Sequence, residues 1–208
     1  MTDPLTRRSL LRATRELSAR DPDLAAVVNA YGPPPLWGRE PGFHTLIHII
    51  LEQQVSLASA KAAYDRLVAA TGQLVPEKFL RLNDAELKAI GFSRQKAGYG
   101  RGLAQAILDS RLDLARLGTL EDAHAKAELI AIKGIGPWTA DIYLLMVLRR
   151  PDAWPVGDLA LATAAQRVKR LRVQPTAEKL ERIGSAWRPW RAVAARILWH
   201  YYLSSRRP

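Results

Sequence analysis

Asp158 is the carboxylate in this sequence whose surroundings best suit chemistry. It stands in "WPVGDLALATAAQRVKRL", where Gly157 precedes it and apolar residues at helical spacing follow. A carboxylate at this place can accept hydrogen bonds from the first free amides of a helix. It can also act as a general base or stabilise a developing positive charge. The local pattern by itself favours the helix cap.

Metal and thiol chemistry find little support in the sequence. His44 and His48 are four residues apart, but no Glu joins them in a zinc-protease pattern, while His124 and His200 occur in unrelated segments. We interpret all four as structural or surface histidines. The chain contains no Cys, which excludes disulfides, a thiol nucleophile and cysteine-ligated zinc or iron–sulfur centres.

A second candidate site is the segment "KGIGPWTADIY", which begins at Lys133 and separates two helical patterns. Gly134 and Gly136 permit positive φ or the close approach of another backbone, and Pro137 suits the first turn of a new helix. Consecutive amides at such a turn, the positive end of the next helix and the Lys133 charge would together hold a phosphate oxygen. An ordinary αα-hairpin packed for stability would show the same glycines.

Composition favours a polyanionic partner. The 31 Lys and Arg residues outnumber the 20 Asp and Glu residues, which gives a formal charge of +11 and predicts salt-dependent binding. With 48% hydrophobic residues, the 208-residue chain can bury one sizeable core or two small ones. Because no apolar run reaches membrane-span length and the N-terminus is charged throughout, we expect an intracellular protein, in the cytoplasm or bacterial nucleoid.

Helix start signals recur along the chain, whereas strand alternation does not, so the predicted fold class is all-α. The tract from Phe43 to Gly72 is too long for one surface helix, and the polar pair Gln53-Gln54 predicts a bend, after which Ser56 caps the second helix. Further start signals are Asp21-Pro22, Asn83 with Glu86, Ser93, Thr119 with Asp122, and Thr176.

Two clusters of Pro and Gly, at 31–42 and 149–158, predict the domain boundaries. Residues 41–150 would form a contiguous helical subdomain that contains the hairpin at about 120–148. Residues 1–40 and 151–208 would form a second helical subdomain from both termini.

The sequence "LIAIKGIGPWTADIYLLMVLRRPDAWPVGDLAL" resembles the helix-hairpin-helix motif, Gly/Pro-rich loop and single aspartate of the DNA glycosylase superfamily of that name. "LIHIILEQQVSLASA" is similar to the segment that carries the DNA-wedging residue in these enzymes. "AWRPWRAVAARILWHYY" is similar to the C-terminal helix of the alkylation-repair branch, 3-methyladenine DNA glycosylase II. The resemblance covers nearly the whole chain and implies two helical subdomains that flank a cleft.

The resemblance also implies an activity. Asp158 matches the catalytic aspartate at the mouth of the cleft, where capping a helix and doing chemistry are compatible. Relatives that also cut the DNA backbone carry a Schiff-base lysine where this chain has Trp138, so a monofunctional glycosylase without lyase activity is expected. Trp138 and Trp199 match the base pocket, where stacking and cation–π attraction favour a flipped alkylated purine such as 3-methyladenine or 7-methylguanine. For Trp187 and Trp190 we predict core packing.

Contacts with DNA follow from the same resemblance. Gln54 matches the side chain that fills the gap left by the flipped base. The implied phosphate-binding residues are Lys133, Gly134, Gly136 and Trp138, and the carbonyls of Ile132 and Gly134 are candidate ligands of a structural Na⁺ or K⁺ ion. No cofactor is implied for the reaction, and the expected partner is damaged double-stranded DNA, bound by a monomer.

Two alternatives stay open: a glycosylase for oxidised or deaminated bases, and a non-catalytic helix-hairpin-helix DNA-binding protein. Ile142 and Leu159 are aliphatic where some relatives have tyrosines, which predicts a wider pocket or one less suited to stacking. Longer bacterial relatives carry an extra N-terminal β-rich domain, and we expect that its loss would weaken nonspecific binding or alter the choice of lesion.

Overall fold

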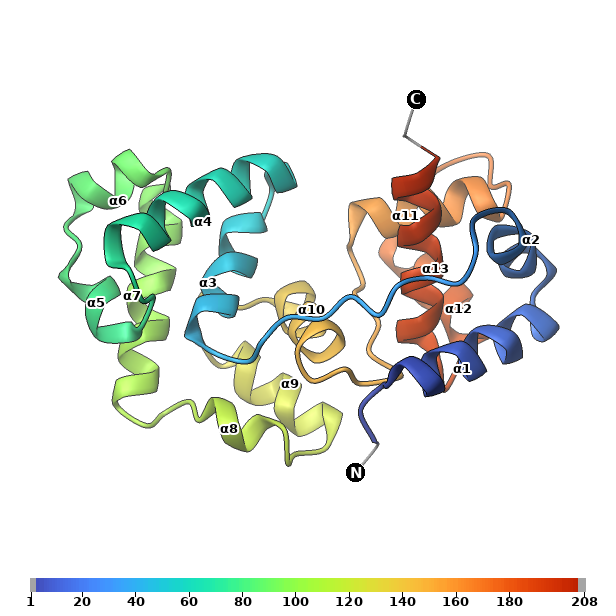
Figure 1. The fold of residues 1–208 in the computed structure, drawn as a ribbon, viewed down its shortest axis with the longest axis horizontal. Coiled ribbons are helices and arrows are strands. Elements are labelled where there is room, and N and C mark those ends of the chain that lie inside the picture. Colours follow the sequence, from blue (N-terminus) through green and yellow to red (C-terminus); the bar gives the residue numbers. More distant parts are fainter. Residues whose placement is uncertain (1–2, 206–208) are drawn as a thin grey trace. The chain divides into compact units, whose positions relative to one another are not determined.

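The computed structural model describes residues 3–205, which form thirteen α-helices and no strand (Figure 1). This architecture confirms the predicted all-α class. None of the described helices combines the length and the apolar character that crossing a bilayer requires. The helices are α1 (Arg7–Arg20), α2 (Pro22–Tyr31), α3 (Phe43–Glu52), α4 (Leu57–Thr71), α5 (Pro76–Arg81), α6 (Asp84–Ile90), α7 (Arg94–Leu108), α8 (Leu114–Leu117), α9 (Asp122–Ile130), α10 (Pro137–Met146), α11 (Leu159–Val168), α12 (Ala177–Ser185) and α13 (Arg191–Ser204).

The chain divides into two compact units. The middle unit comprises residues 39–143, and the terminal unit comprises residues 3–38 and 144–205. The sequence predicted divisions near residues 40 and 150. The structural divisions follow Gly38 and Tyr143, and the second falls inside α10, because this helix continues from one unit into the other.

The middle unit has an aromatic cluster at its centre. Phe79 of α5 is fully buried, and its ring meets the rings of Phe43 and Phe92 edge-on at centroid distances of 5.7 and 5.6 Å. A Cβ atom at Gly100 of α7 would lie 2.5 Å from the Phe79 ring. Gly100 therefore lets α5 and α7 pack closely, although glycine is an unfavourable residue inside a helix.

The terminal unit is built around α13, which is buried continuously from Ala192 to Trp199. Helices α1, α2, α11 and α12 all pack against it (Figure 1). A helix that is apolar on every side is typical of a buried central element. Trp187 is 1% exposed, as predicted for a core residue, whereas Trp190 is only partly buried and donates a hydrogen bond to Glu16 at the surface.

Most helix starts follow their local sequence signals. Asn83 and Glu86 form a reciprocal capping box at α6, and Ser93 caps α7. The prediction at Thr119 was wrong, because α9 begins only at Asp122 and the Thr119 hydroxyl donates to the Arg116 carbonyl. Ser56, Asp21 and Thr176 also cap helices as predicted.

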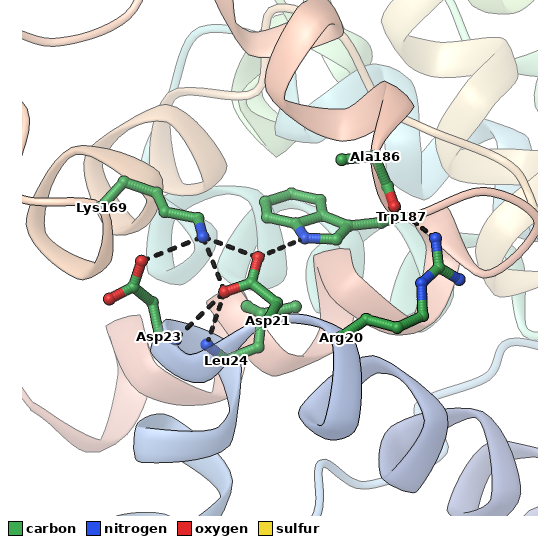
Figure 2. A network of polar contacts seen from close by, with 7 residues as sticks. All are labelled: Arg20, Asp21, Asp23, Leu24, Lys169, Ala186 and Trp187. Atoms are coloured by element: carbon green, nitrogen blue, oxygen red, sulfur yellow. Dashed lines mark hydrogen bonds and ion pairs between the residues drawn. The ribbon is translucent and has the colours of Figure 1, made fainter.

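Asp21 joins distant parts of the terminal unit (Figure 2). It caps α2, accepts two hydrogen bonds from the Lys169 ammonium at 2.7 and 2.6 Å, and accepts one from the Trp187 indole at 2.7 Å. Burial alone would raise the pKa of Asp21, but these donors outweigh it and lower the pKa below 3.8. The ionised form of Asp21 is therefore favoured by folding.

Asp21→Asn should destabilise the protein by about 2 kcal/mol at neutral pH, because it leaves the partly buried Lys169 ammonium and the buried Trp187 indole with a weaker partner. A pKa lowered by folding stabilises the native state above the unfolded value and loses that effect as the pH falls, so the deficit should shrink below pH 3.8. Urea unfolding at several pH values tests this. Asp23→Asn is the control, because Asp23 contacts Lys169 from a more exposed position. Equal losses in both variants would contradict the central role of Asp21.

Candidate functional site

Asp158 stands at the N-terminus of α11, as the sequence predicted for a helix cap. Its Oδ1 atom accepts the backbone amide of Leu161 at 2.7 Å. The exposed Gly157 has φ of +86°, which only glycine adopts readily, and turns the chain immediately before the carboxylate. The side chain is thus held at the positive end of a helix dipole, which stabilises an anion.

Trp199 of α13 contributes a second hydrogen bond to the same carboxylate. Its indole Nε1 donates to Asp158 Oδ1 at 3.1 Å, and the residue is 8% exposed. Two of the residues that the resemblance assigned to the site thus meet inside the terminal unit. A partly buried carboxylate fixed by an amide and an indole is suited to electrostatic stabilisation, because it needs little reorganisation as charge develops.

The hairpin lies in the middle unit between the end of α9 at Ile130 and the start of α10 at Pro137. Gly134 has φ of +96°, and a Cβ atom there would lie 2.2 Å from the ring of Tyr99. Backbone conformation and packing therefore both require glycine at this position. Lys133 beside it is exposed, which leaves its charge accessible to a ligand.

Gly136 differs from Gly134 in both respects. Its φ is not positive, and a Cβ atom there would meet nothing within 4 Å. Glycine at this position is therefore not required by the packing of the protein itself. Trp138 follows in the first turn of α10 and is partly buried within the middle unit.

Gln54 lies in the loop between α3 and α4, where the sequence predicted a bend. It is exposed and has φ of +56°, an unusual conformation for a residue other than glycine. The neighbouring Gln53 points to the hairpin instead: its Nε2 donates to the Gly134 carbonyl at 2.9 Å and to Thr139 Oγ1 at 3.0 Å. Sequence reasoning noted Gln53 only as part of the polar interruption and missed this contact.

The two carbonyls predicted to hold a cation already accept hydrogen bonds. The Ile132 carbonyl accepts the Ile135 amide at 3.0 Å, and the Gly134 carbonyl accepts Gln53. A carbonyl oxygen has two lone pairs, so one accepted hydrogen bond leaves each of them able to bind a cation as well. Ile132 and Gly134 as ligands of a Na⁺ or K⁺ ion therefore stay a prediction.

The described residues contain no group of three or more His, Asp or Glu side chains arranged to hold a metal ion. His48 stacks on Tyr64 with ring centroids 4.2 Å apart and lies 3.7 Å from Glu52. Burial lowers the pKa of His48. These contacts support the structural role that the sequence indicated for it.

The aliphatic positions in the hairpin helix and after Asp158 have different surroundings. Ile142 is buried in the middle unit, whereas Leu159 is 71% exposed in the terminal unit. The predicted effect of these two residues on a base pocket remains a prediction.

The chain is all-helical and contains a glycine hairpin and an aspartate that caps a helix. Comparison with known proteins identifies a class of proteins with this fold. The chain belongs to the HhH-GPD superfamily of base excision DNA repair proteins, whose family model matches residues 47–189.

Relatives within this superfamily share the fold over most of the chain. The Bacillus halodurans DNA-3-methyladenine glycosidase is 30% identical and superposes with a TM-score of 0.78 over 93% of this chain and 91% of its own. The Schizosaccharomyces pombe 3-methyladenine DNA glycosylase Mag1, solved with abasic DNA, is 26% identical with a TM-score of 0.84, over 90% of this chain and 95% of its own. The Bacillus subtilis DNA-3-methyladenine glycosylase is 29% identical over 76% of this chain, which spans 56% of that relative's length.

Proposed function

We propose that this protein is a monofunctional DNA glycosylase that flips alkylated bases out of duplex DNA and hydrolyses their N-glycosidic bond. The observation that carries the proposal is the Asp158 carboxylate, held by the α11 N-terminus and the Trp199 indole in a chain of the HhH-GPD superfamily. The similarity to 3-methyladenine glycosylases supports the choice of alkylated bases.

In the proposed reaction the bond between C1′ and the base nitrogen breaks, and its electron pair leaves with the base. The deoxyribose becomes oxocarbenium-like, and the negative charge of Asp158 stabilises it. Water then adds to C1′, and Asp158 orients it or accepts its proton, which leaves an abasic site. A base such as 3-methyladenine or 7-methylguanine carries a positive charge before cleavage, so it departs without strong acid catalysis.

Trp138 and Trp199 are the proposed aromatic partners of the flipped base. Electron-rich indole faces attract a cationic, electron-poor ring by stacking and cation–π interaction. Trp199 has a second proposed role, because its indole N–H also fixes the catalytic carboxylate. A change at Trp199 would therefore affect both base binding and chemistry.

The hairpin and the α3–α4 loop are the proposed DNA contacts. Amides at Gly134, Gly136 and Trp138, with the exposed charge of Lys133, would bind a backbone phosphate without reading sequence. Gln54 would enter the space left by the flipped nucleotide, where its polar amide could bond the orphaned base. Net charge of +11 supports such binding.

A panel of duplexes, each with one lesion, tests the substrate class. We expect abasic sites, revealed by alkaline cleavage, in duplexes with 3-methyladenine or 7-methylguanine. Excision confined to oxidised or deaminated bases would replace the proposed substrate. Tight duplex binding with no excision from any member of the panel would indicate a non-catalytic DNA-binding protein.

The monofunctional assignment predicts no covalent intermediate. Because Trp138 stands where bifunctional relatives carry the attacking lysine, borohydride should not trap an adduct with lesion DNA, and strands should break only after alkali or an abasic endonuclease is added. Denaturing gels with and without borohydride measure this. A robust trapped adduct would show lyase chemistry and refute the assignment.

A further inference from the structure

Two residues to which the sequence assigned no contact at the site connect the α3–α4 loop to its surroundings in the middle unit. The first is Gln53, which bonds both the Gly134 carbonyl in the hairpin and the Thr139 hydroxyl in α10. The second is Lys96 of α7, whose Nζ donates to the carbonyls of Leu51 and Gln53, each at 2.8 Å. The loop is therefore attached to the hairpin by one side chain and to α7 by another.

Lys96 also neutralises negative partial charge at the C-terminal end of α3. The last carbonyls of a helix lack intrahelical partners and carry the negative end of its dipole. The Lys96 ammonium covers two carbonyls at this end, and burial lowers its pKa. A negative helix end beside DNA would repel phosphates, so a cation in this position favours the approach of a polyanion.

Helix α7 supports the hairpin as well as the loop. Tyr99, one turn after Lys96, packs its ring against Gly134, whose carbonyl accepts the Gln53 amide. The loop, the hairpin and one face of α7 thus form a closed set of contacts. Gln54, with its positive φ, lies in the middle of the tethered segment, between Gln53 and the cap residue Ser56.

We propose that Gln53 and Lys96 are positioning residues that hold the Gln54 loop in fixed register with the hairpin. Phosphate binding by the hairpin is then coupled to insertion of Gln54, because the Gln53 amide joins the loop to the hairpin while Lys96 holds the loop on α7. The inference rests on the proposed function, since it takes Gln54 as the inserted residue. Neither positioning residue needs to touch the lesion.

The physical reason is the cost of the loop conformation. A non-glycine residue at positive φ is disfavoured and persists only where its surroundings hold it. Without the Gln53 amide or the Lys96 ammonium, the loop would sample conformations in which Gln54 is no longer presented. Insertion of Gln54 would then require the loop to be ordered on binding DNA, which costs free energy. In the wild-type protein the loop is already ordered when the protein folds.

Gln53→Met tests the first tether, because methionine keeps the length of the side chain and removes its donor. The probe is a duplex with a tetrahydrofuran abasic analogue beside 2-aminopurine, whose fluorescence reports insertion without any excision. We expect the insertion equilibrium at saturating protein to fall about tenfold, the size expected for two lost hydrogen bonds. Affinity for undamaged duplex should stay within about twofold, because the hairpin amides remain. Lys96→Met should also weaken insertion.

Matched controls separate positioning from general damage. Gln105→Met removes an exposed amide from the same helix as Lys96, and Lys61→Met removes an exposed cation from α4. Neither should change insertion. Thr139→Val should add little in the Gln53→Met background, because its partner is already lost, and melting temperatures must show that each variant is folded.

The outcomes distinguish this inference from the proposed function. If the wild-type protein excises no lesion and gives no fluorescence change, the proposed function itself is refuted. Normal wild-type insertion with unchanged insertion in folded Gln53→Met and Lys96→Met would overturn the positioning roles. Equal loss of insertion and of undamaged-duplex binding would overturn the selective coupling, because the substitutions would then act on the hairpin as a whole.

Discussion

Asp158→Asn is expected to reduce single-turnover excision of alkylated bases by about 10²–10³-fold, the range seen when one well-placed electrostatic group is lost. Asparagine keeps an oxygen that can accept the Leu161 amide and the Trp199 indole, so the α11 cap should survive. It cannot offset the positive charge on the sugar or accept a proton from water. Duplex affinity, measured by gel shift, should therefore change little.

The residual activity of this variant carries further information. Cationic lesions such as 7-methylguanine should retain the highest rates, because their base departs most readily unaided. Asp113→Asn provides a matched control, since Asp113 caps α8 with a carboxylate for which no chemistry is proposed. Unchanged excision in Asp158→Asn would exclude Asp158 from the mechanism. Parallel loss of folding and binding would reduce its role to capping.

Gly136→Val is expected to weaken DNA binding about tenfold or more, equally for damaged and undamaged duplexes. Its backbone has no positive φ, and space exists around the added Cβ, so the fold should be preserved. The new side chain would instead separate the hairpin amides from the phosphate they are proposed to bind. Filter-binding titrations at fixed salt measure the effect. Loss confined to damaged duplexes would contradict a sequence-independent phosphate contact.

The structure gives Gly134 a different expected phenotype. Alanine there would clash with the Tyr99 ring and adopt an unfavourable φ, so Gly134→Ala should cost about 3 kcal/mol of folding stability. Weakened DNA binding by Gly134→Ala would therefore reflect distortion of the hairpin as well as any loss of a phosphate contact. Gly136 is the sharper probe, although the two glycines are equivalent when only the sequence is considered.

Much of the fold could be read from the sequence because its signals are local. The capping box of Asn83 and Glu86 and the cap at Asp158 each depend on residues three positions apart. Such contacts form wherever a helix starts, whatever packs around it. Thr119 shows the limit of this reasoning, since its hydroxyl bonds backward to Arg116 and α9 begins later. A short polar side chain can bond on either side, and local sequence does not decide which.

The contacts that define the candidate site were decided by tertiary structure. Trp199 reaches Asp158 across 41 positions of sequence, and Gln53 reaches Gly134 across 81. The sequence alone identified Asp158, Gly134 and Gln54 as notable from residue type and resemblance, and it predicted the helices that carry them. It could not predict that the Asp158 oxygen accepts an indole, or that Gln53 and Lys96 fix the loop. Such bonds depend on how distant helices pack, because packing alone sets which donors come within hydrogen-bond distance of which acceptors.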